Sequence, residues 1–432
     1  MRVGTTRRRG VAALSTALAG ALALTLALAG CSADAHVDID APAQVDGAFP
    51  DDITQQLQDA VAQAMTATGS SGAIVGVWAP WSGSLVSGFG TESFGSEDAV
   101  TTDMEFRAGR ITRPMICDVL FQLAAEKVVA LDDPVTDYVS GAPDLADVTL
   151  QQLCDGTSGI GAYSDQLSAL FFANPARVWN PMELASYGLG EPRTTSPGAS
   201  YRDSDAGYVL LGLALERATN TSAADLLRQY VFDPLDLNAT SLPTGAPAKA
   251  SATGPVLNGH HSTPDAAGVM NCTEPLEITT LSASSGFTDS GVVSTIDDLG
   301  RYAQALATGA LDPSGSKRFD APIAIDPAAP SWYATKGGAV IAGTLVGQFG
   351  SVPGYATAAF SDPTTGLTVA VVLNNSGSGG GPATNLAWEL AALASKAPAA
   401  DGAAAPEAGL PWTAQQYHDE IAARAICAAP AQ

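Results

Sequence analysis

The chain has 432 residues, of which 46% are hydrophobic and 15% are charged, so it is long enough for one large domain or two smaller ones. Its formal net charge is −24 at pH 7, which argues against a nucleic-acid partner, because proteins that bind nucleic acid carry basic patches. The acidity by itself indicates solubility rather than a particular ligand.

Residues 1–30 are typical of a secretory signal. Arginines at positions 2, 7, 8 and 9 precede an alanine- and leucine-rich run that ends in small residues. The sequence Leu-Ala-Gly before Cys31 resembles a bacterial lipobox, so we expect Cys31 to be lipidated and to become the mature N-terminus. The alternative is a plain signal peptide followed by a chance cysteine. A lipid anchor places the protein on the extracytoplasmic face of the cell membrane without spanning it, and no later stretch is long and apolar enough to cross a bilayer.

The next segments predict a tether, a helix and a hairpin. Residues 31–50 are acidic and alanine-rich without periodicity, and are interpreted as a tether between lipid and domain. A helix is expected from Asp51, because apolar residues recur on one face, namely Ile53, Leu57, Val61 and Met65. Two apolar runs at 72–77 and 84–90, separated by a turn at 80–83, predict a β-hairpin.

A buried helix is predicted within residues 106–134. Apolar residues recur every four positions, at Ile111, Met115, Val119 and Leu123, and a second apolar row lies beside them. A helix with so wide an apolar arc belongs in the interior of a large domain.

The same stretch resembles the first motif of the serine β-lactamase and penicillin-binding protein superfamily. It is most similar to class C β-lactamases and D-alanyl-D-alanine carboxypeptidases. The matching framework residues are Phe106, Arg107, Gly109, Thr112, Leu131, Asp132, Asp133 and Pro134. The resemblance implies a nucleophilic serine and, three residues later, a lysine. These two positions hold Arg110 and Arg113.

Two further motifs keep their framework and lose their reactive residues. Residues 148–160 are similar to a framework segment of the family, and residues 197–212 resemble its second motif. In that motif the expected tyrosine and asparagine fall on Asp203 and Asp205. A shifted register would recover Tyr201 as the tyrosine, but it would break the match of the following Gly-Tyr pair.

The third motif is expected at the start of the closing strands, within residues 344–375. Its cation is replaced by Gln348, whereas its glycine is kept as Gly350. The resemblance covers residues 51–396 and implies an α/β fold, with an antiparallel sheet flanked by terminal helices and an inserted all-helical lobe. Residues 397–432 are interpreted as a linker and a C-terminal helix.

Four cysteines remain after the signal, and export places them in an oxidising compartment, where three disulfide pairings are possible. In the fold that the resemblance implies, the helix that carries Cys117 packs near the segment that carries Cys154. We therefore expect Cys117–Cys154 and Cys272–Cys427. The alternative is four buried free thiols.

The two arginines cannot perform the chemistry of the residues they replace. A guanidinium group is always charged and has no lone pair, so Arg110 cannot attack a carbonyl and Arg113 cannot act as a base. The resemblance implies that the first and second motifs face each other across a cleft. We therefore expect Arg110 and Arg113 to pair with Asp203 and Asp205. The alternative is independent drift to four solvated side chains.

Other candidate nucleophiles and ligands carry weaker patterns. Thr112 does not share a helical face with Arg110 and Arg113. The Ser-x-x-Lys at 314–317 lies in a loop without an apolar helix, and Ser158 matches a structural Ser-Gly pair.

His260 and His261, with Asp265, lack further zinc ligands at suitable spacing. They are interpreted as solvated loop residues, and no metal or cofactor is expected.

These observations predict a catalytically degenerate lipoprotein of the cell envelope. It would bind a peptidoglycan fragment, a peptide or a protein partner at the old cleft, with Arg110, Arg113, Asp203, Asp205 and Gln348 as its binding residues. The arginine pair would hold a carboxylate such as a D-alanine terminus if the aspartates leave it free. The alternative is an active hydrolase of β-lactamase, D,D-carboxypeptidase or esterase type that uses non-standard groups. A third possibility is a purely structural partner of another envelope protein.

Overall fold

The computed structural model describes residues 36–243, 254–400, 402, 404–406 and 409–427, and residues from His36 onward form one compact unit. The expected signal at 1–30 and the expected lipidation site Cys31 lie outside the described residues, as do 31–35 of the expected tether. None of the helices that the structure describes is both long and apolar enough to span a bilayer.

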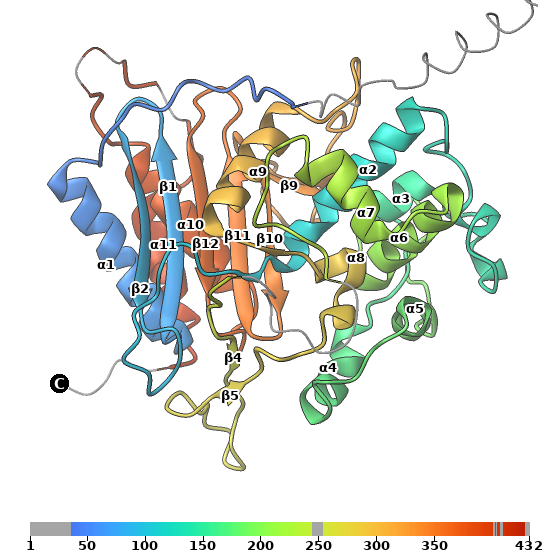
Figure 1. Ribbon diagram of the computed structural model, residues 1–432, viewed down its shortest axis with the longest axis horizontal. Coiled ribbons are helices and arrows are strands. Elements are labelled where there is room, and N and C mark those ends of the chain that lie inside the picture. The colour runs from blue at the N-terminus through green and yellow to red at the C-terminus, as the bar shows by residue number, and fades with distance from the viewer. Residues whose placement is uncertain (1–35, 244–253, 401, 403, 407–408, 428–432) are drawn as a thin grey trace, which may run out of the picture. The chain divides into compact units, whose positions relative to one another are not determined.

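An eight-stranded sheet forms the centre of the described chain (Figure 1). Each strand pairs antiparallel with its neighbours. Its strands, in spatial order, are β2 (Gly83–Gly90), β1 (Gly72–Ala79), β12 (Thr368–Leu373), β11 (Tyr355–Ser361), β10 (Leu345–Val352), β9 (Ala339–Ala342), β8 (Tyr333–Lys336) and β7 (Ile323–Ala324). β12 reads TVAVVL and is buried throughout, as expected for a central strand that is covered on both faces.

Three helices cover one face of the sheet. They are α1 (Asp51–Thr68), α10 (Gly381–Ala394) and α11 (Ala414–Ala423), and Figure 1 shows α10 and α11 behind the strands. α1 buries its predicted apolar face, including Ile53 and Leu57, in the core that these helices share with the sheet. α10 is buried almost all round, because it packs against the sheet, α1 and α11.

The opposite face is covered by α9 (Ile296–Thr308), and a helical lobe that the chain inserts between β2 and β7 lies beside the β10 side of the sheet (Figure 1). The lobe helices are α2 (Thr112–Ala125), α3 (Leu150–Cys154), α4 (Ser164–Ala173), α5 (Pro181–Leu189), α6 (Asp205–Thr219), α7 (Ala223–Leu227) and α8 (Phe287–Ser290). Two small sheets accompany them, formed by β3 (Phe106–Arg107) with β6 (Val293–Ser294) and by β4 (His260–His261) with β5 (Leu276–Glu277).

The predicted hairpin and buried helix are both present, with shifted boundaries. The chain enters α2 through a 3-10 turn, η1 (Gly109–Ile111). Gly109 has φ +59°, and a Cβ there would lie 3.2 Å from Thr357 Oγ1, so glycine allows η1 to lie close to β11. The start of the first motif is therefore fixed against the sheet.

Both expected disulfides are formed. Cys117–Cys154 joins α2 to α3, with 5.7 Å between the Cα atoms. Cys272–Cys427 joins the segment between β4 and β5 to the residue that follows α11 by a few positions, with 5.9 Å between the Cα atoms. The C-terminal helix, expected to follow a linker, is thus tied to the main domain.

Candidate functional site

The first and second motifs meet at one aspartate. Arg110 lies in η1, and its Nη1 is 2.7 Å from Asp203 Oδ2. Arg113 lies in the first turn of α2, and its Nη1 is 2.7 Å from Asp203 Oδ1. Each oxygen of the Asp203 carboxylate therefore binds a different guanidinium group, as the sequence predicted for this residue.

The second acidic partner is one that the sequence analysis did not identify. Arg113 Nε donates to Asp289 Oδ1 at 2.7 Å, and Asp289 lies in α8. Arg113 is only 2% exposed, and its guanidinium carbon lies 4.6 Å from the centre of the Tyr208 ring. A buried arginine needs a matching carboxylate, but no local pattern around Asp289 shows that it is the one.

The prediction that Asp205 pairs with an arginine is wrong. Asp205 is the first residue of α6, and its carboxylate accepts the backbone N–H groups of Tyr163 at 2.6 Å and Ser164 at 2.9 Å. It therefore fixes the start of α4 rather than neutralising a cation. Burial, together with the charge of Asp289, raises the pKa of Asp205 to about 6.

The register of the second motif is the unshifted one. Ser204 caps α6 by accepting the N–H of Gly207, which keeps Gly207 and Tyr208 in the helix where the resemblance places them. The ring of Tyr201 packs on Gly156 instead, where an added Cβ would lie 2.6 Å from Tyr201 Cε2. Burial and the neighbouring Asp203 raise the pKa of this phenol to about 12, so it stays protonated near neutral pH.

The electrostatics of the cluster favour ionised groups. Burial by itself would raise the pKa of Asp203, but the guanidinium groups of Arg113 and Arg110 outweigh it and hold this pKa well below its usual range. Burial likewise opposes the charge on Arg113, yet Asp203 and Asp289 raise its pKa well above the ordinary value. Two cations and two carboxylates thus balance in the place of the expected catalytic groups.

The third motif lies directly against this cluster. Gln348 on β10 is buried and donates from Nε2 to Gly338 O at 2.7 Å, while its Oε1 accepts the N–H of Phe349. Gly350 leaves room for Arg110, because a Cβ at Gly350 would lie 2.6 Å from Arg110 Cδ. The Arg110 side chain therefore lies across β10 and reaches to Asp203 beside the helical lobe. With 30% of Arg110 and 40% of Asp203 exposed, this end of the cluster faces solvent.

Two other hydroxyl groups that the sequence offered as nucleophiles have structural roles. Thr112 Oγ1 donates to Gly109 O at 2.8 Å and accepts the N–H of Val292. Ser158 Oγ accepts the N–H of Ile160. Both hydroxyls hold local backbone and are buried.

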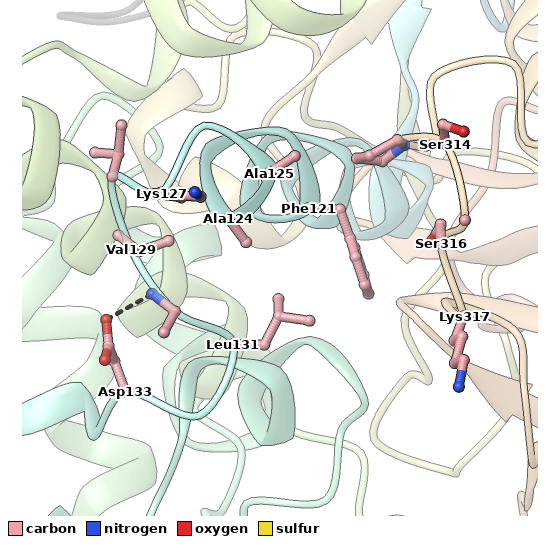
Figure 2. Close-up of a pocket in the computed structure, with 14 residues that line it drawn as sticks. Phe121, Ala124, Ala125, Lys127, Val129, Leu131, Asp133, Ser314, Ser316 and Lys317 are labelled. Carbon is pink, nitrogen blue, oxygen red and sulfur yellow. Dashed lines mark hydrogen bonds between the residues drawn. The ribbon is translucent and has the colours of Figure 1, made fainter.

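The Ser-x-x-Lys at 314–317 does not form a catalytic pair. It lies in a loop beside the end of α2, at a pocket of about 770 Å³ (Figure 2). Figure 2 shows Ser314 at one end of the loop and the Lys317 side chain pointing away from it. The interpretation of this pattern as coincidence agrees with that arrangement.

The expectation that His260 and His261 are solvated is wrong. His260 is 1% exposed and its Nε2 lies 3.1 Å from Ser93 Oγ. His261 stacks on Phe172, with 4.4 Å between ring centres. The two residues form β4 by pairing with β5, and the backbone of His260 also bonds to Asn374 and Ser376 after β12. Among the described residues, no group of three His, Cys, Asp or Glu side chains is arranged to hold a metal ion.

His261 also makes a contact that sequence reasoning missed. Its Nδ1 lies 2.8 Å from Ser376 Oγ, and the same oxygen accepts the N–H of Gly354 at 2.9 Å. Burial lowers the pKa of His261, which favours the neutral ring. The partners are far apart in sequence, and only the pairing of β4 beside the end of β12 brings them together.

The sheet order, the inserted helical lobe and the three adjoining motif positions define a protein of the serine β-lactamase and penicillin-binding protein superfamily. The model of the Beta-lactamase family matches residues 57–394, and the chain belongs to this family.

Curated relatives match part of the chain. Penicillin-binding protein 4* of Bacillus subtilis (strain 168) is 25% identical over 160 residues, which are 35% of this chain and 34% of the relative. Esterase EstB of Burkholderia gladioli is 27% identical over 161 residues, 34% of this chain and 41% of the relative. The chain thus spans between a third and about two fifths of the length of these two relatives.

Solved structures match a larger share of this chain than the curated relatives do. A D-stereospecific amidohydrolase from Streptomyces sp. superposes with a TM-score of 0.64 at 24% identity, over 75% of this chain and 94% of that one. The octameric penicillin-binding protein homologue from Pyrococcus abyssi superposes with a TM-score of 0.63 at 21% identity, over 77% of this chain and 75% of that one. At these identities the structural neighbours show the shared fold.

Proposed function

We propose that this chain is a catalytically degenerate member of its family that binds its ligand without hydrolysing it. The observation that carries the proposal is the ion cluster of Arg110, Asp203 and Arg113 in the place of the serine, tyrosine and lysine. Acyl transfer in this family needs a hydroxyl nucleophile and a group that accepts its proton. Guanidinium groups held by carboxylates supply neither, because they have no lone pair and stay charged.

The exposed end of the cluster supports a binding role. Arg113 is enclosed by Asp203, Asp289 and Tyr208, whereas Arg110 keeps 30% of its side chain exposed. A ligand carboxylate that approaches Arg110 from solvent makes a charge-assisted contact without displacing Asp203. The proposed ligand is a peptide with a free D-amino-acid carboxylate, such as a peptidoglycan fragment.

We also propose that Cys31 anchors the protein to the outer face of the cell membrane. The two disulfides support an exported location, since such bonds persist in oxidising compartments. Labelling cells with an alkyne fatty acid is expected to tag the wild-type chain and not Cys31→Ala. An unlabelled wild-type chain overturns the anchor.

Two measurements on the purified chain test the binding role. A fluorescent penicillin and a fluorophosphonate are expected to leave the protein unlabelled, and calorimetry is expected to detect a peptide that ends in D-alanyl-D-alanine. Arg110→Ala is expected to weaken that binding by about tenfold or more. Arg193→Ala is the matched control, because Arg193 is 31% exposed and pairs with Asp147 at 2.8 Å. Equal affinity in Arg110→Ala and wild type would refute the proposed contact.

One observation favours a second candidate function, an active hydrolase. The hydrogen bond of 2.8 Å between Ser376 Oγ and His261 Nδ1 is the geometry of a nucleophile and its base. In such a reaction Ser376 Oγ attacks the substrate carbonyl carbon, His261 Nδ1 takes the hydroxyl proton and returns it to the leaving group, and water later releases the acyl group. Fluorophosphonate labelling of wild type that is lost in Ser376→Ala would establish this candidate and refute the first.

A further inference from the structure

A second pocket lies on the other side of β10 from the arginine cluster. It has a volume of about 400 Å³, within the range of about 300–1,000 Å³ usual for small-molecule sites. Its walls come from α10, α11, β10 and the start of β8. The lining residues that matter are Trp332, Tyr333, Phe349, Asn385, Trp388 and Gln416.

β10 separates this pocket from the cluster. Successive side chains of a strand point to opposite faces, so Gln348 and Gly350 lie toward Arg110, whereas Phe349 lies toward the pocket. Figure 1 shows α10 and α11, which form the outer wall, on the face of the sheet away from α9. A ligand in this pocket therefore meets none of the three motif positions.

The walls are aromatic. Trp388 lies at their centre, 6.2 Å from Trp332, 5.4 Å from Tyr333 and 5.1 Å from Tyr417 between ring centres. Trp388 and Tyr417 are buried, while Trp332, Tyr333 and Phe349 are half-buried and leave part of their rings exposed. Such rings give a ligand flat apolar surfaces at a low entropy cost, because aromatic side chains have few rotatable bonds.

Polar groups among the rings lack partners. Asn385 is 8% exposed, and its Nδ2 has no hydrogen-bond partner among the described residues. The same holds for Nε1 of Trp388, which is 5% exposed. An unmet buried donor costs about 1–3 kcal/mol, so a ligand oxygen that reaches it adds affinity. Both atoms are donors with almost no exposed surface. The Asn385 amide lines the pocket, and rotation about its terminal bond presents the donor to a ligand oxygen.

The rim of the pocket is electrically balanced. Arg424 Nε lies 3.2 Å from Glu420 Oε2, and both side chains line the opening. Gln416 adds an exposed neutral amide beside them. A strongly charged ligand gains no net attraction from such a rim, whereas a neutral one loses little on entering.

We propose that this pocket binds a pyranose sugar of a neutral saccharide. A pyranose ring has apolar C–H faces that stack on Trp332 and Tyr333, and its hydroxyl or acetamido oxygens accept from Asn385 and Gln416. This is a second site, and it does not depend on how the arginine cluster works. An envelope protein with such a site would hold a glycan on one side of β10 and a peptide on the other.

Titration of the purified chain with the trisaccharide of N-acetylglucosamine and with cellotriose tests the proposal. We expect calorimetric binding by at least one of them, with a shift in tryptophan emission. Trp332→Ala is expected to weaken binding about tenfold or more. Gln416→Ala weakens it, whereas Gln415→Ala does not, because Gln415 points to Asp419 instead.

Asn385→Leu separates ligand binding from a structural role. It removes an unmet donor at similar volume, so the free energy of unfolding is expected to stay level or rise while saccharide affinity falls. Unchanged affinity in both Trp332→Ala and Asn385→Leu overturns the proposal. So does a lack of heat and emission change with both saccharides up to about 10 mM, which covers even millimolar affinity. Arg110→Ala is expected to bind saccharide as wild type does, and loss of binding there also overturns the site.

Discussion

Asp203 holds two arginines at once, so replacing it with asparagine removes the charge from two ion pairs while keeping the shape. Breaking a buried pair costs about 3–5 kcal/mol, and an exposed pair is worth about 0–1 kcal/mol. Arg113 is buried but keeps Asp289, and the Arg110 contact is partly screened by solvent. We therefore expect Asp203→Asn to lower the free energy of unfolding by about 2–3 kcal/mol at pH 7.

Urea unfolding followed by near-UV circular dichroism, with disulfides intact, measures this loss. Asp147→Asn is the matched control, because Asp147 is 55% exposed and pairs only with Arg193 among the described contacts. Its loss is expected to stay below about 1 kcal/mol. Equal losses in the two variants would refute the reasoning that the cluster is a buried, coupled unit.

The effect of Asp203 also has a defined pH dependence. The pKa of Asp203 is lower in the folded chain than in the unfolded chain, so the unfolded chain takes up its proton first as the pH falls. The stabilisation is therefore complete above the unfolded pKa of about 3.9 and is lost as the pH falls through the folded value. The gap between wild type and Asp203→Asn is expected to narrow below about pH 4 and to stay constant from about pH 6 to 8.

Three further variants test other parts of the structure. The pKa of Asp205 is raised to about 6, so the folded chain holds this proton more tightly than the unfolded chain does. The stability of wild type relative to Asp205→Asn is therefore expected to rise as the pH falls from 7 to about 4. The double variant Arg110→Ser with Arg113→Lys is expected to stay unlabelled by fluorescent penicillin, because the new lysine remains paired with acidic groups and protonated. Cys117→Ser with Cys154→Ser is expected to lower the free energy of unfolding by about 2–5 kcal/mol in chemical denaturation.

Each of these has a contrary outcome. A stability difference for Asp205 that does not change with pH would mean that its carboxylate is not protonated in the folded chain. Acylation of the double variant would show that two substitutions are enough to restore chemistry. Unchanged unfolding of the cysteine variant would show that the link between α2 and α3 does not constrain the unfolded chain.

Local patterns predicted the elements that bury one clear apolar face. The helix of Ile53 and Leu57 buries its predicted apolar face against the sheet, and the hairpin that follows it forms β1 and β2 of that sheet. The framework residues around Arg110 were sufficient to place it opposite Asp203. The resemblance predicted the geometry of the motifs, because the sequence keeps the glycines and capping residues that hold this geometry.

Long-range polar contacts were not predictable in the same way. Asp289 and the pair of Ser376 and His261 join segments separated by more than a hundred residues, and no local pattern marks their partners. The sequence analysis paired Asp205 with an arginine because the charges are opposite. In the structure its carboxylate instead accepts hydrogen bonds from backbone N–H groups at the start of α4. Charge matching predicts that a buried ion finds a partner, but it does not say which one.

The carboxylate shared between two arginines makes single substitutions in this cluster costly to the fold. Serine at position 110 would leave one oxygen of the Asp203 carboxylate without its cation, and a neutral residue at position 113 would leave Asp289 buried without a cation. Each of these single substitutions is therefore expected to lower the free energy of unfolding. The charged residues of the cluster are therefore expected to change together, whereas exposed residues away from it can change one at a time.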